Sequence, residues 1–139
     1  MAYNNLIMAK RWQTSKHAVY NCGYHFIWCP KYRRSVLING IDERLKVILN
    51  EKSKEHNWVI EQMEIMPDHV HIFIKCTVDD SPAFVISQLK GFSSFILRKE
   101  FAELKSKLPT LWTRSYYCET VGHISESTIK KYIEEQKNK

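Results

Sequence analysis

The run Met66-Pro67-Asp68-His69-Val70-His71-Ile72-Phe73-Ile74-Lys75 carries the clearest structural pattern in this chain. Side chains of a β-strand point alternately to opposite faces, so a period of two divides the run into two sets. His69 and His71 share one face, and the aliphatic residues that alternate with them share the other. The pattern predicts a strand whose apolar side faces a core and whose second side presents two imidazoles.

The two imidazoles allow two interpretations. Histidine is a common metal ligand, and a pair on one strand face can supply half of a metal site that other parts of the chain complete. A His-x-His pattern also occurs where histidines are ordinary half-buried residues. His69 and His71 are therefore candidate metal ligands whose partners have to be sought elsewhere in the sequence.

The composition is that of one folded domain. The chain has 139 residues, of which 44% are hydrophobic and 12% aromatic, enough to build a core. We expect a single domain over residues 1–139, with a loose polar arm at 1–16 and a C-terminal helix at 125–138. The formal net charge of +6 favours an acidic partner such as nucleic acid, although a modest basic excess also keeps a protein soluble.

The cysteines and the apolar segments bear on where the protein works. None of the four cysteines forms a C-x-x-C pair, so packed, reduced thiols are expected instead of disulfides or a structural zinc site. The first residues lack the apolar core of a signal peptide, and no run approaches the roughly 20 apolar residues of a membrane span. We expect a cytoplasmic protein that is associated with the nucleoid and makes no membrane contact.

The order of the predicted elements defines the fold class. Periodicity and residue preference place strands at 19–29, 58–66, 69–76 and 111–121, and helices at 42–56, 82–105 and 125–136. This order is βαββαβ with one additional helix. It matches the α+β, ferredoxin-like plan, shared by RRM domains, of an antiparallel sheet with helices on one face. In that plan the first and third strands are central, so the histidines of the third strand should lie on the open face.

Punctuating residues set the expected boundaries of these elements. Asp42 is the candidate N-cap of the first helix, and Ser81-Pro82 begins the second. Pro67-Asp68 forms the turn of a hairpin, and Leu108-Pro109 ends the second helix. The fourth strand is expected to be irregular around Arg114-Ser115.

A second constellation lies in the last predicted helix. Tyr132 and Gln136 are spaced i and i+4, so they are neighbours on one helix face. Ile129 and Ile133 form an apolar pair that can dock the helix, and Gly122 before it can act as a hinge. A surface tyrosine and a solvated glutamine in a charged tail would give the same pattern.

Together the two constellations can form one chemical unit. Two imidazoles and the Gln136 oxygen supply three ligands and leave positions open on a divalent ion. A phosphodiester oxygen can take one of these positions, where the ion neutralises charge that develops at phosphorus. Tyr132, one helical turn from a ligand, is then the candidate nucleophile, and its product is a phosphotyrosine ester.

Several segments together resemble a known family. In order and spacing they resemble the single-tyrosine HUH transposases (TnpA type) of the smallest hairpin-ended bacterial and archaeal insertion sequences. The segments are 24–34, 66–71, 89–91 with Ser93-Ser94, and Tyr132 with Gln136. The resemblance covers nearly all of the chain and shows no departure at the candidate catalytic positions.

The resemblance implies an enzyme that cleaves and rejoins single-stranded DNA at element ends that fold as hairpins. It implies a 5′-phosphotyrosine on Tyr132, a free 3′-OH, and Mg²⁺ or Mn²⁺ held by His69, His71 and Gln136. It also implies a homodimer whose sheets join edge to edge. In such a dimer the terminal helix of one subunit can complete the histidine site of the other.

Basic residues are the candidate DNA contacts, because lysine and arginine bind phosphates. The resemblance favours four of them: Lys31, Arg33, Arg34 and Lys90. His25 is expected to be structural and not catalytic. Tyr116 and Tyr117 are rival nucleophiles, but neither has a glutamine one helical turn away.

Three other functions stay open on the sequence. The chain can be a domesticated relative that processes repeated chromosomal hairpins, a non-catalytic nucleic-acid-binding module, or a metal-dependent hydrolase that uses water as nucleophile. The binding module is the weaker alternative, because the sequence has no RNP1-like Gly-Phe-Gly-Phe string. A covalent protein–DNA product distinguishes a strand transferase from the hydrolase and the binding module.

Overall fold

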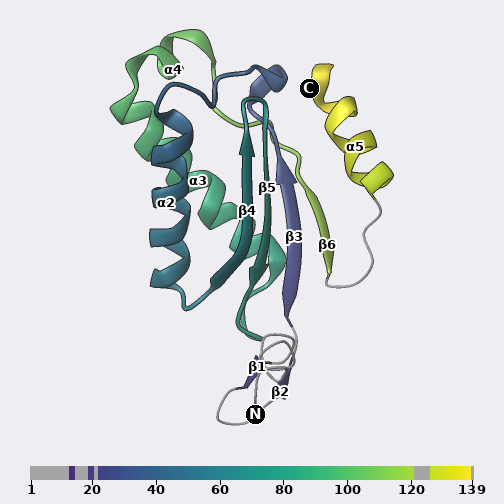
Figure 1. Cartoon of the computed structure of the whole chain (residues 1–139). Helices are drawn as coiled ribbons and strands as arrows, with labels where there is room; N and C mark the ends of the chain where they lie inside the picture. Colours follow the sequence, from purple (N-terminus) through teal and green to yellow (C-terminus); the bar gives the residue numbers. More distant parts are fainter. Residues whose placement is uncertain (1–12, 15–18, 21, 121–125, 139) are drawn as a thin grey trace.

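The computed structural model describes residues 13–14, 19–20, 22–120 and 126–138 (Figure 1). In chain order the elements are β1 (Gln13–Thr14), β2 (Val19–Tyr20), β3 (Gly23–Trp28), η1 (Lys31–Arg33), α2 (Ile41–Glu55), β4 (Val59–Met66), β5 (His69–Lys75), α3 (Pro82–Glu100), α4 (Ala102–Lys107), β6 (Tyr117–Thr120), α5 (Glu126–Glu135) and η2 (Gln136–Asn138). The predicted order of long strands and helices is thereby confirmed.

Four strands form one antiparallel sheet in the spatial order β4-β5-β3-β6. β3 and β5 are the central strands, which confirms the predicted α+β, ferredoxin-like plan. α3 crosses behind the sheet in Figure 1, α2 lies beside α3, and α5 lies near β6. β1 and β2 form a separate two-stranded sheet.

The covered face of the sheet builds the core. Phe26 and Trp28 of β3 and Val70, Ile72 and Ile74 of β5 are all fully buried, which confirms the predicted inward face of the histidine strand. They share one cluster with apolar residues of the two long helices: Leu45, Ile48, Leu49, Val85, Ile86, Leu89 and Leu97. Burying one such aliphatic side chain contributes about 1.5–3 kcal/mol, so β5 is firmly held.

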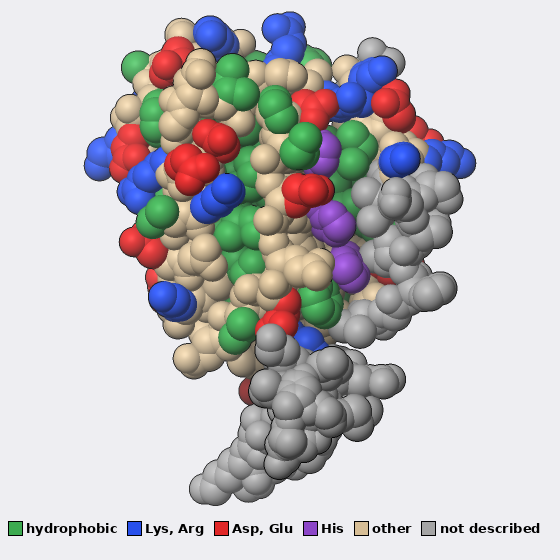
Figure 2. Space-filling view, viewed as in Figure 1, with side chains coloured by type: hydrophobic (Ala, Val, Ile, Leu, Met, Phe, Trp, Pro, Cys, Tyr) green, Lys and Arg blue, Asp and Glu red, His purple; other side chains and the backbone are tan. Residues whose placement is uncertain are grey.

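The opposite face of the sheet carries the histidines. The strand register places His25 of β3 opposite Phe73 of β5, and His71 opposite both Ile27 and Glu64. His25, His69 and His71 are all half-buried. Figure 2 looks onto this face and shows histidine side chains over the sheet with acidic side chains beside them. The predicted placement of the imidazoles on the open face is therefore confirmed.

Three observed boundaries differ from the predicted ones. The strand expected at 19–29 is divided into β2 and β3. The N-cap of α2 is Gly40, with a φ of 96°, and not Asp42, which lies in the first turn where its charge still complements the helix dipole. The helix expected to reach Lys105 is broken at Phe101, whose extended backbone separates α3 from α4.

The strand expected at 111–121 is regular only over β6. Upstream of β6 the chain pairs with the residues that follow β3 through two backbone hydrogen bonds. The Lys31 N–H donates to the Leu111 carbonyl at 2.8 Å, and the Thr113 N–H donates to the Cys29 carbonyl at 3.0 Å. The irregular middle that the sequence predicted is therefore present, and it is tied to the end of β3.

Two predicted boundaries are confirmed. The Ser81 hydroxyl accepts a hydrogen bond from the Phe84 N–H at 3.1 Å at the start of α3, and the turn at Pro67-Asp68 joins β4 to β5. In the part of the chain that is described, no helix is both long and apolar enough to cross a membrane. Most of the arm predicted at 1–16, and Gly122, lie outside the described residues.

Candidate active site

His69 begins β5 directly after the hairpin turn and is held by the residue before it. Asp68 Oδ1 lies 2.9 Å from His69 Nδ1, and an ionised carboxylate can only accept, so the imidazole donates this hydrogen bond. The proton is thereby placed on Nδ1, and the lone pair is left on Nε2. This is the state in which a histidine binds a metal while a carboxylate fixes its ring.

Asp68 is itself fixed by Arg33. The Arg33 Nε–H donates to Asp68 Oδ2 at 2.7 Å, and the two side chains are only 17% and 21% exposed. Burial alone would raise the pKa of Asp68, but the hydrogen bonds from His69 and Arg33 outweigh it and lower that pKa below 3.8. The Asp68 carboxylate therefore stays ionised at neutral pH and can keep both hydrogen bonds.

His71 contacts a third histidine. His25 Nδ1 lies 3.3 Å from His71 Nε2, and the His25 ring stacks on Phe73 with 4.7 Å between ring centroids. Burial lowers the pKa of both imidazoles, and the nearby His25 lowers that of His71 further. The contact between His25 and His71 was not predicted from the sequence, because their proximity follows only from the pairing of β3 with β5.

A pocket of about 340 Å³ opens on this face beside His71. It is lined by Gln62, Met63, Glu64, His71 and Phe73. A β-bulge between Ile60 and Gln62 shifts the register of β4 at this point. Bulges re-aim side chains and are frequent next to active sites. The bulge brings Gln62 and Glu64 onto the same face as His71, and the pocket leaves that histidine accessible.

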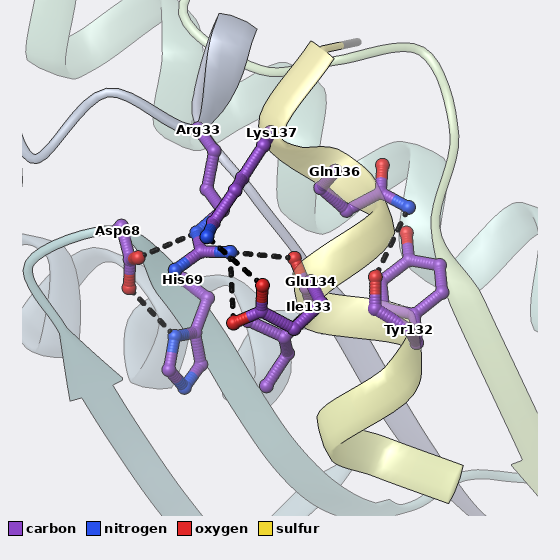
Figure 3. A network of polar contacts seen from close by, with 8 residues as sticks. All are labelled: Arg33, Asp68, His69, Tyr132, Ile133, Glu134, Gln136 and Lys137. Carbon is purple, nitrogen blue, oxygen red and sulfur yellow. Dashed lines mark hydrogen bonds and ion pairs between the residues drawn. The ribbon is translucent and has the colours of Figure 1, made fainter.

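Tyr132 lies on α5 but faces away from the histidines. Figure 3 shows it on the side of α5 opposite to His69. Its ring lies 5.4 Å from that of Tyr117, and its hydroxyl is buried with no hydrogen-bond partner within the described part of the chain. Burial raises the pKa of this phenol to about 12, which the nearby Ser115 opposes only in part. In this arrangement Tyr132 is protonated and shielded.

Gln136 shares the buried side of the tail with Tyr132. The residue is 2% exposed. Its Oε1 accepts a hydrogen bond from Ser115 Oγ at 3.0 Å, and its Nε2 donates to the Tyr132 backbone oxygen at 3.3 Å. The i, i+4 spacing thus places both side chains on one face, but this face is turned toward residues 115–117 and not toward the imidazoles. The side chain of Ile129, predicted to help dock the helix, lies outside the described residues.

Three of the predicted DNA contacts lie at or next to η1. Arg34 is exposed, whereas Lys31 is half-buried with its Nζ 5.1 Å from the centroid of the Tyr32 ring. Arg33 is turned inward, because its Nη1–H donates to the Ile133 carbonyl at 3.1 Å in addition to its bond with the turn before β5. Arg34 and Lys31 are therefore more accessible to a ligand than Arg33.

The fourth predicted DNA contact, Lys90 of α3, holds the chain that precedes β6. Its ammonium lies 2.7, 3.4 and 3.2 Å from the carbonyl oxygens of Thr113, Arg114 and Ser115. Burial lowers the pKa of Lys90 to about 8. These bonds take three carbonyls out of a regular ladder, which explains why the predicted fourth strand begins late. A surface pocket of about 410 Å³ that includes Lys31, Lys90 and Arg114 in its lining lies at this place.

The imidazole pair fits a divalent metal in part. Among the described residues His69 Nε2 has no hydrogen-bond partner, whereas His71 Nε2 faces His25. Across the described ranges, no three His, Cys, Asp or Glu side chains are grouped so that they could hold a metal ion. A metal on the two β5 histidines therefore needs a further ligand, and the predicted one, the Gln136 oxygen, is bonded to Ser115 in this arrangement.

The fold is that of a class of DNA-processing proteins, the transposases, as the similarity to a solved transposase structure reported below shows. The model of the family described as "Transposase IS200 like" matches residues 18–136. This range takes in both β5 histidines as well as Tyr132 and Gln136. The chain belongs to the IS200-like transposase family, which confirms at family level the resemblance seen in the sequence.

Individual relatives agree with this assignment. The ISDra2 transposase TnpA of Deinococcus radiodurans is 37% identical over 123 residues, which cover 87% of this chain and 88% of that protein. The transposase for insertion sequence element IS200 of Salmonella typhimurium is 33% identical over 86% of this chain and 80% of that protein.

Two solved structures are also similar. A candidate transposase from Deinococcus radiodurans superposes with a TM-score of 0.84 at 31% identity, covering 91% of this chain and 99% of that one. A REP-associated tyrosine transposase bound to a REP hairpin gives a TM-score of 0.57 at 12% identity, over 87% of this chain and 67% of that one. At that identity the second likeness shows a shared fold alone.

Proposed function

We propose that this transposase cleaves and rejoins single-stranded DNA at hairpin-bearing element ends, through a 5′-phosphotyrosine on Tyr132. Membership of the IS200-like family supports strand transfer on DNA. The observation that carries the proposal is the geometry of His69, whose bond to Asp68 frees Nε2 on the open face. A hairpin substrate is supported by a protein of the same fold that is bound to a REP hairpin.

His69 and His71 would hold Mg²⁺ or Mn²⁺, with Gln136 as a third ligand once α5 has moved. Such an ion, when bound, stabilises negative charge that develops on the phosphoryl oxygens. Imidazole binds a metal only in its neutral form. The burial that lowers the pKa of His71 keeps this ring neutral at physiological pH and so supports its role as a ligand.

Tyr132 would act as the nucleophile. Its oxygen forms a bond to the phosphorus of the scissile phosphodiester, the bond from phosphorus to the 3′ oxygen breaks, and that oxygen takes up a proton to become a 3′-OH. The phenolic proton goes to water or to a neighbouring base. The ester keeps the energy of the broken bond, so another 3′-OH can attack it and release Tyr132 without ATP.

This chemistry requires the buried hydroxyl of Tyr132 to leave its present position. Tyr132 and Gln136 are turned away from His69 in Figure 3, so α5 has to rotate or has to come from a second copy of the chain. The second route is supported by the two outer strands, β4 and β6, which pair on one side only within the described residues and could extend the sheet in a homodimer. Either movement also removes the burial that raises the pKa of Tyr132 to about 12.

Basic residues around η1 and α3 are proposed to bind phosphates of the DNA: Lys31, Arg33, Arg34 and Lys90. Arg34 and Lys31 can do so as they stand. Arg33 and Lys90 first have to give up bonds to protein oxygens. We therefore expect substitutions of Lys31 and Arg34 to weaken hairpin binding and to reduce its salt dependence.

A covalent-adduct assay tests the proposal. The protein is mixed with a single-stranded hairpin oligonucleotide from the end of its element, with Mn²⁺ or with EDTA, and is run on a denaturing gel. We expect a protein–DNA band that requires the ion, disappears in Tyr132→Phe and persists in Tyr116→Phe, a control at an exposed tyrosine. Hairpin binding should survive both substitutions. An adduct in Tyr132→Phe would mean that another nucleophile acts.

The products of the same assay separate the alternative functions. A cleaved strand with a free 5′-phosphate and no adduct would indicate a hydrolase, and binding without cleavage under any ion would indicate a binding module. A domesticated relative would form its adduct on chromosomal repeat hairpins. Inverted repeats that flank the gene would instead identify a mobile element.

A further inference from the structure

A continuous set of contacts connects the histidine hairpin to the tail helix (Figure 3). His69 Nδ1 lies 2.9 Å from Asp68 Oδ1, and Asp68 Oδ2 lies 2.7 Å from Arg33 Nε. The Nη1 of Arg33 donates to the Ile133 carbonyl at 3.1 Å and lies 3.7 Å from the Glu134 carboxylate. One guanidinium therefore holds both the carboxylate that orients His69 and the last turn of α5.

The backbone of η1, which carries this guanidinium, has an unusual conformation. Tyr32 and Arg33 have φ angles of 57° and 51°, a left-handed conformation that side chains with a Cβ seldom adopt. The other non-glycine residues with positive φ in the described ranges, Asn39 and Asn57, are asparagines, which tolerate it better. Strain of this kind persists where the surroundings fix it, and it gathers at functional sites.

The two adjacent arginines of this segment, Arg33 and Arg34, differ in how far their side chains are exposed. The side chain of Arg33 is 17% exposed and has partners in the turn before β5 and in α5, whereas Arg34 is exposed. A residue that serves only solubility or only phosphate binding has no need to be directed inward. The planar fork of arginine can hold two acceptors at once in fixed directions, which lysine cannot do.

We propose that Arg33 is a positioning residue that couples the tail helix α5 to the metal site through Asp68. With Arg33 in place, Asp68 keeps the proton of His69 on Nδ1 and presents Nε2 to the ion. Through the Ile133 carbonyl the same guanidinium ties α5 to the hairpin, so one side chain contacts both parts of the proposed site. The inference rests on the proposed function of His69 as a metal ligand.

The link also gives Arg33 a second partner during the reaction. When α5 moves to bring Tyr132 toward the histidines, Arg33 Nη1 gives up the Ile133 carbonyl while Nε keeps Asp68. The released N–H groups are then available to a phosphate oxygen of the DNA, which guanidinium binds well. His69 therefore stays oriented while Arg33 exchanges a helix carbonyl for the substrate.

Metal affinity of the DNA-free protein tests this coupling. Mn²⁺ binding is measured by electron paramagnetic resonance for the wild type, Arg33→Gln, Asp68→Asn and the double variant. Each single substitution is expected to weaken Mn²⁺ binding about 10-fold, as is typical for residues that orient a metal ligand. The double variant should also lose about 10-fold and not about 100-fold, because both residues act through one link.

Arg34→Gln is the matched control, since it removes the same charge from the adjacent, exposed residue. We expect its Mn²⁺ affinity to stay within about twofold of wild type, because exposed charges interact weakly through solvent. An unchanged affinity in Arg33→Gln, or an equal loss in Arg34→Gln, would overturn the inference. Arg33→Lys keeps the charge but lacks the planar fork of the guanidinium, so it should lose Mn²⁺ affinity as Arg33→Gln does. If Arg33→Gln fails to fold, Arg33→Lys takes its place in the experiment.

A second readout needs neither metal nor DNA. The ¹⁵N chemical shifts of His69 report which ring nitrogen carries the proton. The wild type should show the Nδ1–H tautomer, and Arg33→Gln should show a mixture of the two tautomers. A wild-type protein that shows this difference but forms no Mn²⁺-dependent adduct with hairpin DNA would refute the proposed function and keep the coupling. An identical tautomer in both proteins would refute the coupling itself.

Discussion

The two halves of the candidate site are built in different ways. The histidine half lies on β5, a central strand whose aliphatic side chains are fully buried, and Asp68 fixes the ring of His69. The tyrosine half lies on the terminal helical segment, where half-buried Tyr132 packs on Tyr117 of β6 and buried Gln136 is bonded to Ser115 just before β6. The histidine half faces the open side of the sheet, whereas the tyrosine half is turned toward residues 115–117.

This difference indicates which half responds to the substrate. Moving His69 would disturb a strand that is paired on both sides and packed into the core. Moving α5 breaks the Ser115–Gln136 hydrogen bond, the contact of Arg33 with α5 and the packing of Tyr132. Each such hydrogen bond contributes about 0.5–1.5 kcal/mol, whereas each buried aliphatic side chain of β5 contributes about 1.5–3 kcal/mol, so α5 is the part that moves more easily.

The largest predicted effect comes from removing an imidazole of the histidine half. His69→Ala and His71→Ala should each lower the rate of adduct formation about 1,000-fold or more, because loss of the ion removes several kcal/mol of transition-state stabilisation. The rate is measured by single-turnover gel assay, with circular dichroism as a check of folding. His56→Ala, at a half-buried histidine at the end of α2, is the matched control and should leave the rate unchanged. A rate above one-tenth of wild type in either site variant would contradict the assignment.

A smaller effect is expected when a contact that holds the tyrosine half in place is removed. Ser115→Ala removes the hydroxyl that donates to the Gln136 oxygen at 3.0 Å, so less free energy is needed to release α5. The single-turnover rate of adduct formation should rise about 2- to 10-fold, the equivalent of one hydrogen bond. Ser94→Ala, at a half-buried serine of α3, is the control. A lower rate in Ser115→Ala would mean that this hydroxyl assists the reaction directly.

The smallest effect concerns the free energy of unfolding, which should depend on pH through the half-buried histidines. Burial lowers the pKa of His25 and His71 below 6.5 in the folded protein. As the pH falls below 6.5, the unfolded chain takes up protons that the folded chain resists, so the free energy of unfolding should decrease. Urea unfolding at pH 8, 7, 6 and 5 measures this change. His25→Gln should show a weaker dependence between pH 7 and 5, and an equal dependence in both proteins would contradict the explanation.

Local sequence patterns predicted the histidine half of the site well. Alternation alone identifies the inward residues of β5 and the outward imidazoles, because a buried face selects apolar side chains at every second position. The Ser81 cap and the turn at Pro67-Asp68 are short-range features that a few residues determine. The segments that resemble the family lie on β3 and η1, the β4–β5 hairpin, α3 and the tail, and they were sufficient to predict the family.

Features that depend on tertiary contacts were not predictable in the same way. His25 meets His71 only because β3 pairs with β5 in one register. The late start of β6 follows from the Lys90 ammonium, which binds three carbonyls from another element. Spacing places Tyr132 and Gln136 on one helix face but does not say which way that face turns.

The central claim is that the tyrosine half of the site delivers the nucleophile, Tyr132, to the histidine half. Peptide mapping of the covalent adduct tests this claim most directly. Protein treated with hairpin DNA and Mn²⁺ is digested with protease and nuclease, and the nucleotide-bearing peptide is sequenced by tandem mass spectrometry. We predict that the phosphate is attached to Tyr132. Attachment to Tyr116 or Tyr117 would contradict the claim, and so would cleavage of the DNA without a nucleotide on any tyrosine.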